Sequence, residues 1–317
     1  TIEEAMSDEE YSDAASEESD RGRAMKKGGD IEFELPHPDH LFKDVGREDL
    51  WRKFTAGQTT FRFNGHEFTR SAAVQRVYLR HKPFMQGGMR LVYGMVLEKG
   101  MAAPDAAANM MCAKRLFQDL ERDRGFQAHS AFCKSTAVAS FYAKLFRKAT
   151  DALGALVQLG FLDCQLYTPV GTEEGYHFCG ENWLKGHFVK LNSNNGFVNE
   201  TEYHEHSAVA QAFSHFTFAR SKGELLVVDL QGICGGDSGA PYCLLTDPQV
   251  HSRGSFERFG NGDLGREGFN AFFQKHKCNE LCERLKLRKE WDLHDPTHVL
   301  PIPGVDDCIK AIYGRNP

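Results

Sequence analysis

A short apolar strand that ends in polar residues constrains this chain more than any other stretch. Leu225–Val228 is a run of four apolar residues, which is typical of a buried strand. Asp229-Leu230-Gln231-Gly232 follows, and because side chains alternate along an extended chain, Asp229 and Gln231 should share one face. A second acid, Asp247, comes after a glycine-rich loop. Two carboxylates and a carboxamide at a strand end can hold Mg²⁺, although solvated acids on a surface loop would give the same pattern.

The composition favours a folded, non-membrane protein. With 317 residues, 41% of them hydrophobic and 24 of them Phe, the chain can build one large or two small cores. No apolar run approaches the ~18 residues of a membrane span, and no secretory apolar segment opens the chain. Nine cysteines without a disulfide-scaffold rhythm then predict the reducing cytoplasm, where clustered Cys and His indicate metal binding.

Charge is unevenly distributed along the chain. Residues 1–20 carry nine acids and no base, so the net charge of −6 leaves the remainder at about +3. A nearly neutral folded part argues against nucleic acid as a partner. Residues 1–30, acidic and Ser-rich and then basic and Gly-rich, are predicted to be a disordered tail with candidate phosphorylation sites. Residues 49–54 could form a short amphipathic helix, either for a regulatory partner or packed on its own domain.

A glycine turn and a lysine suggest a phosphate site in the first half of the chain. Residues 89–98 and 109–117 are predicted to form an antiparallel pair. Gly87 and Gly88, before the first strand, would let backbone N–H groups approach a phosphate. Lys114, on the second strand, could neutralise phosphate charge. The alternative is an ordinary hairpin with a common Ala-Lys pair.

Further elements are predicted from periodicity. Residues 129–160 should form a long helix with Gly160 as its C-cap, and residues 200–220 a second helix that carries His215. Strands are expected at 163–167, 176–178 and 187–194. Gly260–Gly265 fits GxGxxG, but no strand–helix–strand unit surrounds it, so a dinucleotide fingerprint is not predicted.

A compact cluster of metal-ligand residue types follows. His276, Cys278 and Cys282 lie within seven residues, with the two cysteines spaced by one helical turn. Such ligands suit Zn²⁺ in a closed structural site, which needs a fourth ligand. The alternative is two buried thiols and a surface histidine.

The order of these motifs differs from that of ordinary protein kinases. The chain has no His-Arg-Asp loop and no Asp-Phe-Gly motif, and its GxGxxG follows the acids instead of preceding the lysine. The chain resembles instead the atypical alpha-kinases, a family that includes kinases of elongation factor 2 and of myosin heavy chains. The motifs are QAFSHFTF at 211–218, VVDLQG at 227–232, LTDPQVH at 245–251, FGNGDLG at 259–265 and HxCNxxC at 276–282. The resemblance covers about 80–287 and is strongest from residue 186.

The resemblance implies an α+β fold of two lobes, with ATP in the cleft and a structural zinc site. It implies a disordered tail at 1–30, an N-terminal extension at 31–79 that packs on the kinase, a catalytic domain at 80–287 (N-lobe about 80–180, C-lobe about 181–287) and a C-terminal extension at 288–317. It places the glycine turn at 260–265 near the peptide substrate instead of the nucleotide.

The resemblance also implies roles for individual residues. Those expected to bind ATP are Gly87, Gly88, Arg90, Lys114 and, at the adenine hinge, Glu181. Gln231 and Asp247 would hold Mg²⁺, and Asp229 would orient or deprotonate the acceptor hydroxyl. His215 would complete the zinc site of His276, Cys278 and Cys282.

The implied function is ATP- and Mg²⁺-dependent transfer of phosphate to Thr or Ser of a protein, with autophosphorylation expected. Elongation factor 2 and a myosin tail are candidate substrates, and the cytoplasm is the expected location. One alternative is a zinc-stapled pseudokinase or scaffold that binds nucleotide without transfer. Another is a zinc hydrolase, which would need an open metal position that a four-ligand site lacks.

Two features depart from the family pattern. The loop from Asp229 to Asp247 is longer than is usual for the family, and displacement of Asp247 would remove a metal ligand, with Asp237 as a weak substitute. In addition, residues 127–172 contain no glutamate, so the helix after Lys114 offers no partner for the lysine–glutamate pair of ordinary kinases.

Overall fold

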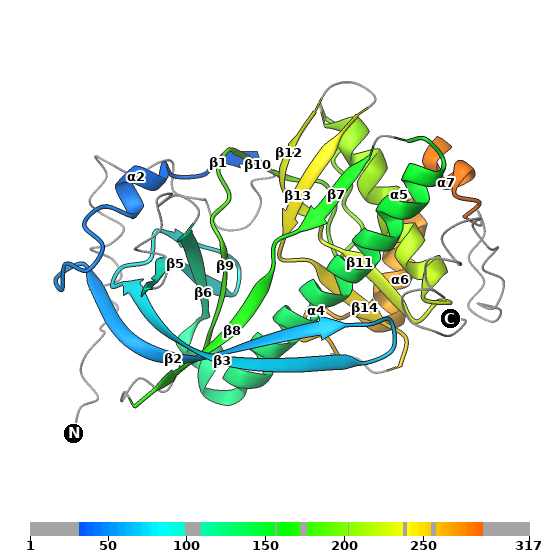
Figure 1. Cartoon of the computed structure of the whole chain (residues 1–317). Helices are drawn as coiled ribbons and strands as arrows, with labels where there is room; N and C mark the ends of the chain where they lie inside the picture. The colour runs from blue at the N-terminus through cyan, green and yellow to red at the C-terminus, as the bar shows by residue number, and fades with distance from the viewer. Residues whose placement is uncertain are drawn as a thin grey trace.

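The structure is a computed structural model that describes residues 32–98, 109–155, 157–171, 176–201, 203–236, 240–254 and 258–287. The predicted tail at 1–30 and the predicted extension at 288–317 lie outside these residues. Figure 1 shows two lobes, one built on the strands at its left and one on the strands and helices at its right. The expected mixture of helices and strands is confirmed, and the elements follow one another as in an α+β fold.

A curved seven-stranded sheet forms the first lobe. Its order is β3-β2-β8-β9-β6-β5-β4, and β3 also pairs with β5, so the sheet curls back on itself. All of its pairs are antiparallel. The strands are β2 (Trp51–Phe63), β3 (Phe68–Arg80), β4 (Met85–Gln86), β5 (Arg90–Leu97), β6 (Met110–Leu116), β8 (Cys164–Val170) and β9 (Phe178–Asn182).

Residues 51–80 are part of this sheet. The prediction of a short amphipathic helix at 49–54 is wrong, because β2 begins at Trp51 and its side chain is buried in the lobe. A short helix, α2 (Pro38–Leu41), precedes it, and Phe42 packs on Trp51 with ring centroids 6.2 Å apart. Trp51 belongs to one core cluster of the lobe and Phe54 and Ala56 to another, so β2 packs on both of its faces near its start. The segment predicted as an N-terminal extension at 31–79 therefore contributes β2 and nearly all of β3 to the first-lobe sheet.

The second lobe contains a five-stranded sheet, a two-stranded ribbon and three helices. The sheet order is β1-β10-β12-β13-β7, in which only β7 and β13 pair in parallel. The sheet comprises β1 (Glu32–Glu34), β7 (Gln158–Phe161), β10 (His187–Lys190), β12 (Gln231–Gly235) and β13 (Tyr242–Thr246). The ribbon comprises β11 (Leu225–Val228) and β14 (Gln249–Ser252), and the helices are α5 (His204–Arg220), α6 (Gly265–Lys275) and α7 (Glu280–Arg284).

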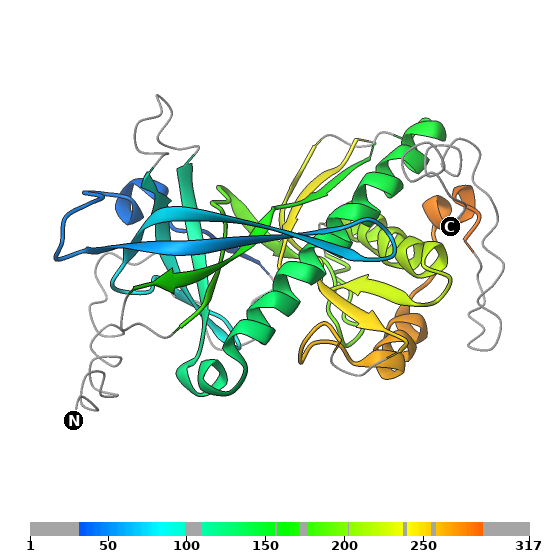
Figure 2. The same ribbon diagram turned by 60° about the horizontal axis from the view of Figure 1, so that its bottom comes forward.

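One long helix joins the lobes. Helix α4 (Gln118–Ala152) runs along both lobes in Figures 1 and 2 and contacts β2 and β8 of the first and β7 and α5 of the second. The predicted helix exists, but it begins earlier and ends earlier than predicted. The prediction that Gly160 is its C-cap is wrong, because Gly160 lies in β7, and Gly154, with φ +67°, follows the helix end instead.

The largest core cluster lies between α4, α5 and the second-lobe sheet. Buried apolar residues recur every three or four positions along α4, as expected of an amphipathic helix. Phe146 of α4 contacts Phe213 and Phe216 of α5 edge to face, with ring centroids 5.4 and 5.3 Å apart. These aromatic contacts fix α5, and with it the strand β11 that α5 covers.

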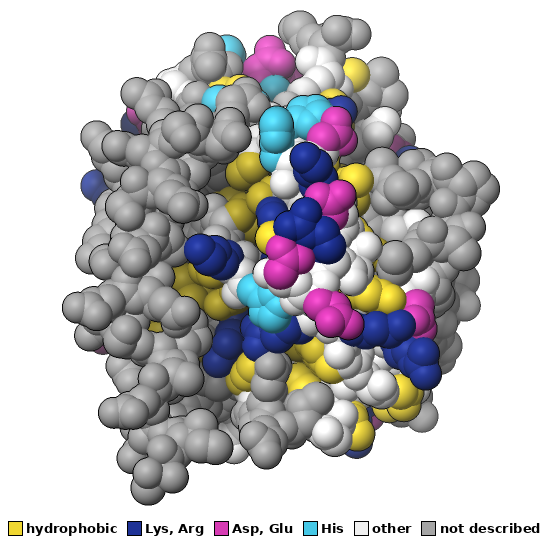
Figure 3. All heavy atoms as spheres, turned by 90° about the vertical axis from the view of Figure 1, so that its left-hand side faces the viewer, with side chains coloured by type: hydrophobic (Ala, Val, Ile, Leu, Met, Phe, Trp, Pro, Cys, Tyr) yellow, Lys and Arg dark blue, Asp and Glu magenta, His cyan; other side chains and the backbone are white. Residues whose placement is uncertain are grey.

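Charges of both signs cover the outer face of the first lobe. Figure 3 shows Lys and Arg side chains interleaved with Asp and Glu there. Ion pairs of this kind join Lys53 and Arg76 to Glu98, at 2.6 and 3.5 Å. Because these pairs are exposed, each contributes little to stability. Among the helices that the structure describes, none combines the length and the apolar character needed to cross a membrane.

Candidate active site

Lys114 connects the two lobes at the centre of the site. Its ammonium group, on β6, donates to Asp247 Oδ2 at 2.7 Å and to Thr246 Oγ1 at 3.0 Å, and it forms an ion pair with Glu181. The Thr246 hydroxyl in turn donates to the Glu181 carboxylate, 2.7 Å from both oxygens. Lys114 and Glu181 are both buried. The network therefore joins the first-lobe sheet to the end of β13 through fully paired polar groups.

Arg90 brings a second cation to the same carboxylate. Arg90 lies at the start of β5, and its Nη2 is 2.9 Å from Asp247 Oδ1. Its guanidinium covers the Phe132 ring of α4, with Cζ 4.1 Å from the ring centroid. Its NH1 group is buried and without a hydrogen-bond partner in the structure. A cation held in this way can accept an anionic ligand without leaving its aromatic platform.

The pKa values follow from these pairings. Burial alone would raise the pKa of Asp247, but the charges of Arg90 and Lys114 hold it well below its usual value. Burial would likewise lower the pKa of Lys114, but the carboxylates of Asp247 and Glu181 raise it above its usual value. Both groups are therefore charged over the whole physiological range.

Asp229 has a cationic partner of its own. Its Oδ1 lies 2.6 Å from Lys190 Nζ of β10, and its Oδ2 accepts from Gln231 Nε2 at 3.3 Å. The predicted placement of Asp229 and Gln231 on one face is thus confirmed, with Leu230 buried on the other. Burial raises the pKa of Asp229, and Lys190 offsets part of that rise. A carboxylate with a raised pKa is suited to accept a proton.

Both acids occupy unusual backbone conformations. Asp229 has φ +58° and Asp247 has φ +51°, in the left-handed region that is strained for most residues other than Gly. Hydrogen bonds to the following residue hold the first of them in place, because the Asn192 side chain accepts from Leu230 N at 2.9 Å through Oδ1 and the backbone Leu191 N donates to Leu230 O. Strain of this kind concentrates at functional sites.

The lengthened loop between the two acids is a β-hairpin that keeps them together. Strands β12 and β13 pair from Gln231↔Thr246 to Gly235↔Tyr242, so the additional residues extend the hairpin at the end away from Asp247. Gly232, with φ +156°, is required near the base, because a Cβ there would collide with the Leu244 carbonyl. Asp237 lies outside the described residues. The hairpin register thus places Asp247 beside Gln231.

The remaining predicted ATP residues lie near this centre in different ways. Gly87 and Gly88 form the turn between β4 and β5, two residues before Arg90, and Gly87 N donates to Arg90 O at 2.8 Å. Glu181 is on β9, opposite Cys112 in the register, and its side chain faces Lys114. Sequence reasoning gave Glu181 only a place at the adenine hinge and missed it as the lysine's partner. It also missed Lys190, for which no motif gave a signal, and Thr246, which lies in the LTDPQVH motif next to Asp247.

The glycine-rich turn before α6 is anchored from within. Buried Asp263 accepts from Ser252 N at 2.8 Å, from Ser252 Oγ at 2.6 Å and from Gly265 N at 3.0 Å. His251 Nδ1 accepts from Leu264 N. Asp263 is therefore a structural carboxylate, and the turn leads directly into the helix, with no strand–helix–strand unit around it.

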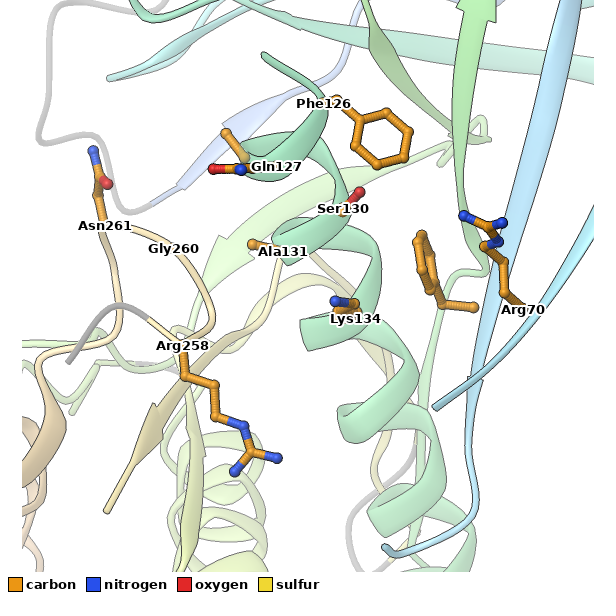
Figure 4. A pocket seen from close by; sticks show the side chains of 11 residues that line it. Arg70, Phe126, Gln127, Ser130, Ala131, Lys134, Arg258, Gly260 and Asn261 are labelled. Carbon is orange, nitrogen blue, oxygen red and sulfur yellow. The ribbon is translucent and has the colours of Figure 1, made fainter. Parts of the chain in front are cut away.

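A basic pocket of about 620 Å³ lies beside this turn. Figure 4 shows Lys134 of α4 between Arg70 of β3 on one side and Arg258 on the other. The Ser130 hydroxyl lines the pocket and is buried without a hydrogen-bond partner in the structure. No acidic residue lines the pocket in the part of the chain that the structure describes; the lining is completed by Phe61, Phe126, Gln127, Ala128, Ala131, Gly260 and Asn261.

The four predicted zinc ligands come together in the second lobe. His215 of α5 and His276 after α6 have Nδ1 and Nε2 3.1 Å apart. Cys278 Sγ lies 3.7 Å from His215 Nδ1, and Cys282 Sγ lies 3.7 Å from His276 Nε2. All four donor atoms lie within 4.8 Å of one another. These separations fit the edges of a tetrahedron around one Zn²⁺.

One detail of the predicted zinc cluster is wrong. Cys278 does not share a helix with Cys282, because it precedes α7, which begins after Asn279. The Asn279 side chain caps α7 by accepting from Cys282 N at 3.0 Å, and it donates to Ala208 O at 2.7 Å. The two thiols converge because this cap turns the chain between them. Burial lowers the pKa of His276 to about 4, which favours the neutral imidazole that binds metals.

Comparison with known proteins gives one consistent result. The model of the alpha-kinase family matches residues 85–282. The chain is 31% identical over 210 residues to alpha-protein kinase vwkA of Dictyostelium discoideum, which covers 65% of this chain and 30% of that protein. It is 44% identical over 107 residues to human eukaryotic elongation factor 2 kinase, which covers 34% of this chain and 13% of that protein. The chain thus spans less than a third of these relatives.

A solved structure has the same fold. The alpha-kinase domain of myosin-II heavy chain kinase A, determined in complex with AMP-PNP, superposes with a TM-score of 0.59 at 23% identity. The superposition covers 75% of this chain and 97% of that one. At this level of identity the likeness establishes the common fold.

Proposed function

We propose that this chain, which belongs to the alpha-kinase family, is an ATP- and Mg²⁺-dependent protein kinase that phosphorylates Ser or Thr of a protein substrate. The observation that carries the proposal is the meeting of cations from one lobe with acids from the other. Arg90 and Lys114 come from the first-lobe sheet, and Asp247 comes from the hairpin of the second. Phosphoryl transfer asks a protein mainly for positioning and for neutralisation of charge, which this set supplies.

Each residue has a role in the proposed reaction. Arg90 and Lys114 bind the phosphates of ATP, with the Gly87–Gly88 turn beside them, and Glu181 keeps Lys114 charged and positioned. Glu181 is also proposed to lie close to the adenine, because β9 leads into the connection between the lobes. Asp229, next to Lys190, accepts the proton of the Ser or Thr hydroxyl as it attacks the γ-phosphate.

Gln231 and Asp247 are the proposed ligands of Mg²⁺. The hairpin register that supports this proposal pairs Gln231 with Thr246, the residue before Asp247, and amide and carboxylate oxygens are donors that Mg²⁺ accepts. When bound, the ion would supply positive charge to the triphosphate. Asp247 is ion-paired with Arg90 and Lys114 in this structure, so both cations are already oriented toward the place where phosphate charge would arrive.

The Cys₂His₂ cluster is proposed to hold one structural Zn²⁺. With four protein ligands the coordination is closed, which excludes the water that a zinc hydrolase needs. The ion would tie α5 to the segment after α6. Because α5 covers β11, the strand that ends at Asp229, the zinc would stabilise the catalytic strand from behind.

The basic pocket is proposed to receive acidic groups of the protein substrate. It combines three cations and an unpartnered hydroxyl beside the glycine-rich turn that the family pattern assigns to the peptide. Elongation factor 2 and a myosin tail are the substrates to test first, because kinases of both are among the relatives. Autophosphorylation is proposed for the Ser-rich N-terminal region.

The decisive experiment measures transfer of labelled γ-phosphate from Mg-ATP to a threonine peptide and to the protein itself. Transfer by the intact chain that disappears in Asp247→Ala would support the kinase. Binding of ATP without any transfer would favour the pseudokinase alternative. The hairpin supports the kinase over that alternative, because the lengthened loop keeps Gln231 paired with Thr246, the residue before Asp247.

A further inference from the structure

A second cluster of sulfur and nitrogen donors lies in the first lobe, outside every site described above. Cys133 of α4, Cys164 of β8 and Cys179 of β9 have their sulfur atoms within 4.8 Å of one another. Cys133 Sγ is 3.6 Å from Cys164 Sγ and 3.7 Å from Cys179 Sγ. The three thiols, which come from three different elements, therefore converge.

A histidine stands beside the three sulfurs. His129 Nδ1 lies 3.4 Å from Cys179 Sγ, and the histidine is buried. His129 and Cys133 are four residues apart on α4, so their side chains lie one turn apart on the same side of the helix. Helix α4 thus carries His129 and Cys133 in a His-x₃-Cys pattern, and the paired strands β8 and β9 carry one cysteine each. Together these residues connect α4 to the sheet.

The distances match tetrahedral zinc coordination. Bonds of about 2.3 Å to sulfur put neighbouring sulfurs about 3.8 Å apart, and a sulfur and an imidazole nitrogen slightly closer. The sulfur–sulfur spacings of 3.6 and 3.7 Å agree with those edges, and so does the 3.4 Å from His129 Nδ1 to Cys179 Sγ, while the donor atoms that all lie within 4.8 Å of one another are the three sulfurs. They also match the 3.7 Å separations of sulfur and nitrogen in the Cys₂His₂ cluster.

We propose that Cys133, Cys164 and Cys179 hold a second structural Zn²⁺, which fastens α4 to strands β8 and β9, and that the His129 imidazole beside Cys179 moves to complete the site as the fourth ligand. Binding replaces the thiol protons, which leave to solvent, with three zinc–sulfur bonds and one zinc–nitrogen bond, and no atom changes its oxidation state. Three thiolates and one Zn²⁺ leave a single negative charge. Arg90, whose guanidinium lies over the ring of Phe132 next to Cys133, brings a positive charge near the site.

The site would support the nucleotide-binding residues directly. Cys179 is the register partner of Lys114 across β6 and β9, and Cys133 follows Phe132, whose ring carries the Arg90 guanidinium. Zinc at this point would fix the strand that carries Cys179 and the helix that carries Phe132 relative to each other. Packing of small apolar side chains alone would account for buried thiols, but it does not require three sulfur atoms from three elements to lie within 4.8 Å of one another.

The test counts zinc in the full-length protein isolated from zinc-supplemented cells under reducing conditions. We expect two zinc ions per chain in the wild type and one in Cys164→Ser, which changes the most exposed of the three cysteines. Cys278→Ser should also retain one, because it removes only the Cys₂His₂ ion. Cys243→Ser, a buried cysteine outside both clusters, is the matched control and should keep two.

A single zinc in the wild type that is lost in Cys278→Ser and kept in Cys164→Ser would overturn the proposal. A disulfide among the three cysteines in the freshly purified protein would overturn it too. If Cys164→Ser does not fold, cadmium NMR of the cadmium-loaded wild type decides. Two signals, one from a site with three sulfur ligands, support the proposal, and one signal refutes it.

Discussion

Lys114 Nζ lies 2.7 Å from Asp247 Oδ2, and the two residues are 133 positions apart in the chain. One comes from the central strands of the first lobe and the other from the base of a hairpin in the second. Their contact therefore sets the spacing of the two lobes at the point where ATP is proposed to bind. Because the pair is buried, loss of either member leaves the other charge without compensation.

Replacing Lys114 tests the proposed phosphate contact. Lys114→Met should lower kcat/KM for phosphate transfer by about 100-fold or more, since a buried donor that stabilises developing charge commonly contributes that much. Arg115→Met is the matched control, because Arg115 is the next residue on β6 and stacks on Tyr176 instead. Steady-state transfer assays with both variants give the comparison. Equal losses in the two variants would count against a specific role for Lys114.

The pH dependence of transfer tests Asp229 as the proton acceptor. Asp229 must be ionised to act, and burial raises its pKa above the ordinary value of 3.8 while Lys190 opposes that rise. The rate constant kcat should therefore fall as pH falls through this raised pKa. Lys190→Met removes the opposing charge, so the acidic limb of the profile should move to higher pH. An acidic limb at the same pH in both proteins would contradict this assignment.

Several parts of the site could be predicted from sequence because they are local. The apolar run 225–228, the turn into Asp229 and the HxCNxxC spacing each depend on a few neighbouring residues, and the resemblance to the alpha-kinases that they carried is confirmed. The strand pair that holds Lys114 was also predicted correctly, since alternation and a glycine turn specify it. These signals need no knowledge of distant contacts.

The missed features depend on pairing between distant segments. Lys190 reaches Asp229 only because β10 pairs with β12, and Glu181 reaches Lys114 only because β9 pairs with β6. No motif marks either residue. Trp51 was assigned to a helix because six residues show too little of the period to separate helix from strand. Gly160 resembled a C-cap, but β7 pairs with β13 there, and tertiary pairing overrides a local stop signal.

The hairpin between the acids gives a prediction about a single glycine. Gly232→Ala should lower kcat at least tenfold, because a Cβ would push the Leu244 carbonyl away and shift Asp247 relative to Gln231. It should also reduce the free energy of unfolding by about 1–3 kcal/mol. Gly254→Ala is the control, since a Cβ there meets nothing within 4 Å. Chemical unfolding and transfer assays measure both effects, and unchanged kcat in Gly232→Ala would refute the argument.

Removal of the zinc proposed for the Cys₂His₂ cluster should destabilise the second lobe before it affects the first. Cys282→Ser leaves three ligands and should reduce the free energy of unfolding by about 3 kcal/mol or more, as loss of a structural metal commonly does. Hydrogen exchange should rise first in α5 and α7, which the cluster joins. Cys243→Ser again serves as the control. Unchanged exchange in α5 would show that this cluster does not fasten the helix.

The basic pocket predicts a preference for acidic substrates. Arg258→Glu reverses one of its three cations, and it should raise KM about tenfold for a threonine peptide with flanking acids. KM for a neutral peptide should change little, and kcat should be retained, because Arg258 contacts none of the groups proposed to bind ATP. Lys134→Glu, which reverses the cation between Arg70 and Arg258, should have the same selective effect. A rise in KM that is equal for both peptides would place the effect outside the pocket and refute this source of specificity.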